Sequence, residues 1–239
     1  MQLLDFAVIS NENIARDVYH LTLQNGSAAP PAPGQFVNLL VDGHYLRRPI
    51  SLCDWQDGTL TLIYKVVGQG TEKLSAYTAG QSISVLTNLG NGYTIVDAQR
   101  PLLIRGGVGV PPLYYLAKEL VAAGQKPMAL LGFQSAEDSF YGDEFAVLCE
   151  TRVVIKDFVT DAMANLDCDA IYACGPEPML KAIYDQAKQL PPGRMQLSFE
   201  ARMACGFGAC MACSCRTAAG YKRICKDGPV LTKEEIAWQ

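Results

Sequence analysis

The chain has 239 residues, of which 49% are apolar and 18% charged, and its formal net charge is −4. A chain of this length buries enough surface to fold without disulfides or metals, and it has room for one large domain or two ordinary ones. It has no block of lysine or arginine and no apolar run approaching about 18 residues, which argues against nucleic acid, acidic membrane surfaces and a membrane span.

The N-terminal residues carry no basic stretch and no cleavage site of the kind found in export signals, so we expect a cytoplasmic chain with reduced thiols. The sequence has only two histidines, His20 and His44, and this nearly excludes a metal centre built on imidazole. Nine cysteines remain, and their uneven distribution makes them the more informative group.

Residues 1–97 combine short alternating runs of apolar and polar residues with turn-forming segments such as the proline-rich stretch at 28–34. Alternation with a period of two predicts half-buried strands, and several short strands in succession are typical of an antiparallel barrel or sandwich. Residues 72–77 have room for one or two helical turns. Strands are predicted at 18–24, 35–41, 59–65 and 82–86.

Two short motifs in this region suit a phosphate-containing ligand. In the first, Arg48-Pro49-Ile50-Ser51, a rigid Pro-Ile step separates a cation from a hydroxyl. Arg48 could pair with a phosphate, and Ser51 could donate a hydrogen bond to a ring nitrogen or carbonyl. Downstream, Gly68-Gln69-Gly70-Thr71 offers flexible backbone N–H groups beside a hydroxyl. The alternative interpretations are a solvated Arg47-Arg48 pair and an ordinary hairpin turn.

After Asp97 the pattern changes to short buried strands that alternate with helical stripes. This alternation indicates βαβ units and a parallel sheet, so we expect an α/β domain at 98–197. Strands are predicted at 102–104, 128–132, 152–155, 170–173 and 195–199, and helices at 113–121, 143–149 and 178–189.

Glycine-containing turns follow two of these strands. Gly106-Gly107-Val108-Gly109 lies between a strand and a helix, where glycines permit a sharp turn and let a pyrophosphate approach backbone N–H groups. Pro111 suits the first helical turn, because its missing N–H is not needed there. Cys174-Gly175-Pro176 follows another strand and suggests a second anion site. A plain strand–helix turn and a buried apolar cysteine are the respective alternatives.

Five cysteines lie within 21 residues near the C-terminus. Cys205, Cys210, Cys213 and Cys225 form the pattern C-x4-C-x2-C-x11-C, whose first three members have the plant-type [2Fe–2S] ferredoxin spacing. Small residues between the first two let a loop wrap tightly and aim N–H groups at sulfur. Structural zinc is the main alternative, but only one pair has the C-x2-C spacing that zinc sites use twice. We expect Cys215 to be a spare thiol, although it is a rival fourth ligand.

The motifs R-P-x-S, G-x-G-T, G-G-x-G-x-x-P and C-G-P occur in an order that resembles the ferredoxin–NADP reductase superfamily. The cysteine pattern, with Glu200-Ala201-Arg202-Met203-Ala204 before it and Asp227-Gly228-Pro229 after it, resembles more narrowly the electron-transfer subunits of NAD-dependent (class 1B) dihydroorotate dehydrogenases. The resemblance spans essentially the whole chain. It implies a six-stranded FAD-binding barrel at 1–97, a Rossmann-like NAD domain at 98–197 and a [2Fe–2S] segment at 198–239.

The same resemblance implies site residues. NAD(H) would lie at the glycine turn, through Gly106, Gly107 and Gly109, and at Cys174, Gly175 and Pro176, with Cys174 near the nicotinamide. The cluster ligands would be Cys205, Cys210, Cys213 and Cys225. The residues implied for FAD are Arg48, Pro49, Ile50, Ser51, Ile63, Tyr64, Lys65, Gly70 and Thr71.

We expect no catalytic residue for an organic substrate, because no paired carboxylates and no Ser–His arrangement stand out. The resemblance implies an FMN-containing partner subunit that oxidises dihydroorotate in pyrimidine biosynthesis, in a heterotetramer of two copies of each chain. Electrons would pass from FMN through the [2Fe–2S] cluster to FAD and leave as NADH. Two alternatives stay open: a reductase of the same superfamily that serves an oxygenase, hydrogenase or sulfur-reducing partner, and a non-catalytic zinc-binding module.

The choice of nucleotide follows from residues 132–138, at the end of the second strand of the α/β region. A 2′-phosphate normally requires arginine or lysine there. This stretch contains no cation and two acids, Glu137 and Asp138, which would repel the extra phosphate. We therefore expect NAD(H) in preference to NADP(H).

Overall fold

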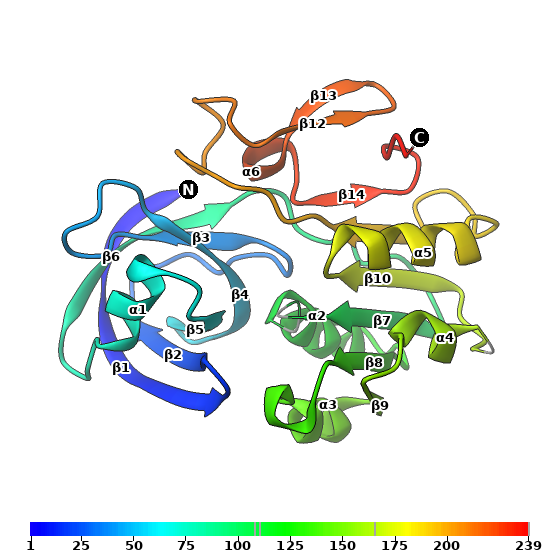
Figure 1. Ribbon diagram of the computed structural model, residues 1–239, viewed down its shortest axis with the longest axis horizontal. Helices are drawn as coiled ribbons and strands as arrows, with labels where there is room; N and C mark the ends of the chain where they lie inside the picture. The colour runs from blue at the N-terminus through cyan, green and yellow to red at the C-terminus, as the bar shows by residue number, and fades with distance from the viewer. Residues whose placement is uncertain (108, 110, 165, 239) are drawn as a thin grey trace.

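The computed structural model describes residues 1–107, 109, 111–164 and 166–238. Its N-terminal part is a closed antiparallel barrel of six strands in the order β1-β2-β5-β4-β3-β6, on the left of Figure 1. This confirms the six-stranded barrel, and β2 and β5 have the predicted bounds. The strands are β1 (Gln2–Ala15), β2 (Val18–Gln24), β3 (Phe36–Leu39), β4 (Arg48–Gln56), β5 (Thr59–Lys65) and β6 (Ser82–Leu89).

The barrel is filled by the apolar residues of its alternating strands. Leu21 and Leu23 of β2 and Leu60 and Leu62 of β5 are all at most 1% exposed, as the two-residue period requires. Helix α1 (Gln69–Ser75) packs on this core through Leu74. The segment 68–71 is therefore not a hairpin turn: Gly68 precedes α1 and the next three residues form its first turn.

The second part is a sheet of six strands in the order β14-β11-β10-β7-β8-β9. The five strands from β7 to β11 are parallel, which confirms the α/β prediction, and β14 joins the edge antiparallel to β11. The strands are β7 (Pro101–Gly106), β8 (Met128–Phe133), β9 (Glu150–Ile155), β10 (Ala170–Cys174), β11 (Met195–Ser198) and β14 (Val230–Thr232).

Helices cover both faces of this sheet. Helices α2 (Pro111–Ala122) and α3 (Gly142–Leu148) pack on one face together with Leu103 and Leu131. Helices α4 (Val159–Met163) and α5 (Glu177–Ala187) pack on the other face with Leu102 and Ile104. Alternate residues of β7 thus serve opposite cores, as expected for a strand that is buried on both faces. Helix α2 begins at a proline, as predicted, and α4 was not predicted.

The cysteine-rich segment runs across the top of the molecule, above both the barrel and the sheet (Figure 1). It contains a hairpin of β12 (Ser214–Thr217) and β13 (Gly220–Arg223), and the short helix α6 (Ile224–Asp227). Its buried side chains, Cys213, Ile224 and Cys225, share one core with Phe36 and Leu89 of the barrel. The segment is therefore packed against the barrel, and its β14 completes the sheet.

Two contacts fix the barrel against the sheet. Lys118 of α2 forms an ion pair with Asp54 of β4, with both carboxylate oxygens 2.7 Å from Nζ. Tyr93, in the buried connection between the two parts, donates a hydrogen bond to the carbonyl oxygen of Ala173 at 3.1 Å.

Among the described residues, none of the helices combines the length and apolarity that a bilayer crossing requires.

Candidate functional site

The first motif lies where two neighbouring barrel strands separate. Arg48-Pro49-Ile50-Ser51 pairs only with β3, because the β4–β5 pairing begins at Leu52. On the other side, β5 loses its β4 partner after Leu62, so Ile63, Tyr64 and Lys65 pair only with β2. The two motifs expected to bind FAD therefore form the facing, unpaired edges of one opening. Unpaired backbone N–H and C=O groups need a partner, and a flavin ring, with donors and acceptors along its edge, fits this need.

The side chains around this opening differ in whether their polar groups are already hydrogen-bonded within the protein. The Ser51 hydroxyl, half-buried, has no hydrogen-bond partner among the described residues. Tyr64 is 2% exposed, and its hydroxyl already donates to Oδ1 of Asn11 at 3.0 Å, so its phenol is committed to the barrel. Burial raises the pKa of Tyr64 well above its ordinary value, so the phenol stays protonated even in alkaline solution.

Arg48 lies directly on the first turn of α1. A Cβ placed on Gly70 would overlap Nε of Arg48, so only glycine permits this approach. The Thr71 hydroxyl accepts hydrogen bonds from the amide of Val67 at 2.9 Å and donates to the carbonyl oxygen of Gly68 at 3.0 Å. Thr71 thus holds the turn through its hydroxyl, whereas the Arg48 guanidinium, which donates to the carbonyl oxygen of Leu46, lies beside it with N–H groups suited to a phosphate.

The two glycine-containing turns meet at the carboxyl ends of β7 and β10, which are adjacent and parallel. A Cβ on Gly109 would lie 2.5 Å from the carbonyl oxygen of Cys174, and a Cβ on Gly106 would lie 2.6 Å from Sδ of Met179. Gly107 has a φ of +63°. Val108, the remaining member of the motif, lies outside the described residues. Helix α2, which follows β7, and helix α5, which follows β10, cover opposite faces of the sheet. The chain therefore departs in opposite directions from two adjacent strands, and α/β sheets bind nucleotides at this kind of switch point.

A cavity of about 700 Å³ opens beside these turns. It extends from Val18 and Lys65 of the barrel to the loop that follows β9. Gly106, Gly107 and Pro176 line it, whereas Gly109, Cys174 and Gly175 are packed behind them. Burial raises the pKa of the Cys174 thiol to about 12, so this group stays a neutral thiol.

The end of β8 differs from the sequence-based expectation in one respect. Asp138 accepts hydrogen bonds from Arg16 of the barrel at 2.7 and 3.1 Å, so the stretch that lacks a cation in sequence has one beside it in space. Lys156, which follows β9, lines the same cavity. Both cations come from distant parts of the chain, and no local pattern could have indicated them.

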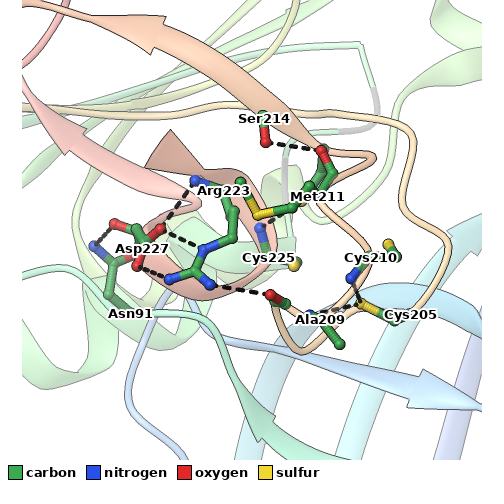
Figure 2. A network of polar contacts seen from close by, with 11 residues as sticks. Asn91, Cys205, Ala209, Cys210, Met211, Ser214, Arg223, Cys225 and Asp227 are labelled. Atoms are coloured by element: carbon green, nitrogen blue, oxygen red, sulfur yellow. Dashed lines mark hydrogen bonds and ion pairs between the residues drawn. The ribbon is translucent and has the colours of Figure 1, made fainter. Parts of the chain in front are cut away.

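Three of the four predicted cluster ligands are labelled in Figure 2: Cys205 and Cys210 lie in a tight loop, and Cys225 lies on the adjacent helix α6. The amides of Ala209 and Cys210 donate to Sγ of Cys205 at 3.3 and 3.4 Å, and the amide of Cys225 donates to Sγ of Cys213 at 3.3 Å. Burial opposes ionisation of Cys205, but these donors and the Phe207 amide outweigh it and lower the pKa of its thiol to about 6. Sulfur atoms that accept several N–H bonds fit cluster ligands.

The thiols are arranged as two pairs. The Cys210 amide donates to Sγ of Cys205, and the Cys225 amide donates to Sγ of Cys213, so each of these hydrogen bonds joins two of the predicted ligands. In the described part of the chain, no three cysteine, histidine or acidic groups converge as closely as a single metal ion requires. Two pairs suit a cluster in which each iron takes two thiolates better than one zinc ion with four. Cys215, on β12, is half-buried and packs against the core shared with the barrel.

Residues that sequence reasoning did not identify hold this loop. Arg223 donates to the carbonyl oxygen of Gly208 at 3.0 Å and pairs with Asp227 through two nitrogens, at 2.9 and 3.2 Å (Figure 2). Asn91 of the barrel connection exchanges hydrogen bonds of 2.7 and 3.0 Å with the backbone of Val230. Asn38 of β3 donates to the carbonyl oxygen of Cys205 at 3.1 Å. Only Asp227 had a sequence signal, as part of the Asp-Gly-Pro that follows the last cysteine.

Known proteins match this arrangement over nearly its whole length. The protein-family model described as the iron–sulfur cluster binding domain of dihydroorotate dehydrogenase B matches residues 200–237. The dihydroorotate dehydrogenase B (NAD(+)), electron transfer subunit, of Geobacillus sp. (strain WCH70) is 43% identical over 250 aligned positions, covering 96% of each chain. Its counterpart from Bacillus cereus (strain G9842) is 39% identical and covers 99% of each chain.

Solved structures of reductases share the fold of this chain. An NADH-dependent reduced ferredoxin–NADP oxidoreductase, studied for flavin-based electron bifurcation, superposes with a TM-score of 0.88 at 30% identity, over 98% of this chain and 90% of that chain. Phthalate dioxygenase reductase, at 18% identity, shares the fold with a TM-score of 0.68, over 90% of this chain and 87% of that one. The chain therefore belongs to the family of electron-transfer subunits of dihydroorotate dehydrogenase B.

Proposed function

We propose that this chain carries electrons from an FMN-containing partner subunit, which oxidises dihydroorotate to orotate in pyrimidine biosynthesis, through a [2Fe–2S] cluster and FAD to NAD+. The observation that carries the proposal is the position of Asn38. Its backbone pairs with Pro49 of the R-P-x-S motif, and its side chain donates to Cys205 of the cluster loop. One residue thus joins the edge of the expected flavin opening to the expected cluster, so the two redox groups would be close neighbours.

The three groups complement each other chemically. Bound FAD exchanges a hydride with nicotinamide and single electrons with an iron–sulfur cluster, which neither of the other two groups does. The residues of this chain bind and orient these groups, and we assign no catalytic residue to it.

For FAD, we propose the facing strand edges and the α1 turn: Arg48, Pro49, Ile50, Ser51, Ile63, Tyr64, Lys65, Gly70 and Thr71. For NAD(H), we propose the two turns beside the cavity, with Gly106, Gly107, Gly109, Cys174, Gly175 and Pro176. Cys205, Cys210, Cys213 and Cys225 would hold the cluster. The corresponding domains would be 1–97, 98–197 and 198–239.

We propose NAD(H) over NADP(H), because Arg16 pairs with both Glu137 and Asp138, so two carboxylates face one cation there and the remaining negative charge would oppose a 2′-phosphate. A catalytic efficiency with NADPH comparable to that with NADH would contradict this choice. We also propose a heterotetramer with two copies of each subunit and a cytoplasmic location.

The test is coexpression with an FMN-containing, dihydroorotate-oxidising subunit. The proposal expects the two chains to copurify and to reduce NAD+ when dihydroorotate is added. Copurification without this activity, or activity of the partner alone at the same rate, would contradict it.

A second candidate is a reductase subunit for a different partner, which the similarity to the ferredoxin–NADP oxidoreductase favours. In that case the chain would bind FAD and cluster but would not associate with the dihydroorotate-oxidising subunit. A colourless, zinc-loaded protein would instead support a non-catalytic module.

A further inference from the structure

Arg105 is a fully buried cation at the end of the strand that leads into the first glycine turn. Its residue is 0% exposed, and its backbone in β7 lies between Leu131 of β8 and Cys174 of β10. The guanidinium carbon lies 3.6 Å from the centre of the Phe133 ring and 5.1 Å from that of Phe140. The side chain therefore occupies an aromatic niche in which arginine is a costly choice.

Within the described part of the chain, no carboxylate pairs with this charge. Nη1 donates to the carbonyl oxygen of Gly107, but Nε and Nη2 have no partner among the described residues. No ion pair within the described ranges includes Arg105. Burial lowers the pKa of Arg105 to about 9, so the group is still a cation at neutral pH. A buried charge with unmade hydrogen bonds destabilises a protein, and an apolar residue would suit a purely structural role better.

The position of the charge indicates what would compensate it. Gly106 and Gly107, the next two residues, line the cavity of about 700 Å³, as do Phe133 and Phe140, the two rings over the guanidinium. The charge thus lies directly behind the wall where the turn offers its backbone to a nucleotide. Charges interact strongly across a wall of low dielectric constant, so a cation there favours an anionic ligand without touching it.

We propose that Arg105 is a positioning residue whose buried positive charge favours the diphosphate of the nicotinamide dinucleotide at the Gly106–Gly107 turn. This inference rests on the proposed function, and it names a residue that sets the affinity of the chain for the nicotinamide dinucleotide. It predicts two effects of opposite sign. Removal of the charge weakens the binding of diphosphate ligands, and it leaves the protein without ligand at least as stable as before.

The experiment uses the purified chain with its FAD and cluster, and compares Arg105→Met with Arg105→Lys. Arg194→Met is the matched control, because it removes a cation that directly precedes β11, at the amino ends of the parallel strands and away from the glycine turns, where Arg194 pairs with Asp169. The affinity for ADP-ribose, which has the diphosphate but no nicotinamide, is measured by calorimetry. We expect this affinity to fall roughly 10- to 100-fold in Arg105→Met, because one charge–charge attraction across the wall is lost. It should change little in the other two variants. The melting temperature and FAD content should not fall.

Each other outcome contradicts the inference. An ADP-ribose affinity within twofold of the original in Arg105→Met would show that the charge does not act on the diphosphate, and a shifted flavin reduction potential with unchanged affinity would assign it to the flavin. An Arg105→Met variant that fails to fold, or melts at a clearly lower temperature, would make the residue structural. If the unaltered chain bound neither ADP-ribose nor NADH, the proposed function itself would fail. Normal binding with an unaffected variant would overturn only the role of Arg105.

Discussion

Asn38 and Cys205 are 167 residues apart in sequence, and the Asn38 side chain donates a 3.1 Å hydrogen bond to the Cys205 carbonyl oxygen. Asn38 is 1% exposed, so the bond is shielded from water. It fastens the beginning of the cluster loop to a barrel strand, and the adjacent Gly206 provides the space for it: a Cβ on Gly206 would overlap the Asn38 amide. The geometry of the cluster loop therefore depends on the barrel.

The Gly206→Ala substitution tests this connection. Gly206 has a φ of +77°, which disfavours any side chain, and the added methyl would also push Asn38 away. We expect roughly 1–3 kcal/mol of local strain and a loss of iron and sulfide, with FAD retained. The control is Gly43→Ala, since Gly43 has a φ of +78° but nothing within 4 Å of its Cβ position. Equal iron loss in both variants would attribute the effect to backbone strain rather than to the contact with Asn38.

Substitution of two cysteines separates the cluster ligands from the spare thiol. Cys225 is 1% exposed and its amide donates to Sγ of Cys213, whereas Cys215 packs into the core shared with the barrel. We expect Cys225→Ser to abolish the cluster and Cys215→Ser to preserve it. Iron and sulfide analysis of both purified variants decides this, and a Cys225→Ser variant with full iron content would disprove the ligand assignment.

The flavin opening is tested at the first turn of α1. A methyl group on Gly70 would displace the Arg48 guanidinium, so we expect Gly70→Ala to weaken FAD retention about tenfold, since a charge-assisted bond is lost. Gly68→Ala is the matched control, because Gly68 has an extended backbone and open space at its Cβ position. FAD content after dialysis measures the effect. Equal retention in the two variants would count against a phosphate contact at Arg48.

His20 gives the stability a defined dependence on pH. Burial lowers the pKa of His20 below its ordinary value of 6.5, although Glu12 and Glu144 act in the opposite direction. The unfolded chain therefore takes up a proton near pH 6.5 that the folded chain resists, and stability falls as the pH drops below that value. Chemical unfolding at pH 7 and pH 5 should show a smaller loss of stability in His20→Gln than in the unaltered chain. An identical loss would mean that His20 does not contribute.

The sequence predicted the elements that obey a strict local period. Strands β2 and β5 alternate regularly and were placed to the residue, and α2 follows its proline as expected. The first barrel strand, β1, was missed because its apolar residues do not alternate cleanly: Phe6 and Val8 are buried, whereas Leu3 and Ile9 are exposed. The short strand β14 was missed because its place depends on a sheet edge formed by residues far earlier in the chain.

In the candidate site, too, the residues with a local sequence pattern could be predicted, and those that depend on distant parts of the chain could not. The motif residues come together as their order implied, because each is tied to the end of a strand. Asn38, Arg16 and Arg105 carried no local signal. Their roles arise from approaches across many residues, such as the 122 that separate Arg16 from Asp138, or from burial beside aromatic rings.

The most direct test of a chain that holds redox groups in series is an anaerobic titration of the purified protein with NADH, followed by visible absorbance. The account predicts a yellow-brown protein with flavin and iron–sulfur bands, and NADH should bleach both bands. A colourless protein, or flavin and cluster bands that NADH leaves unchanged, would contradict it.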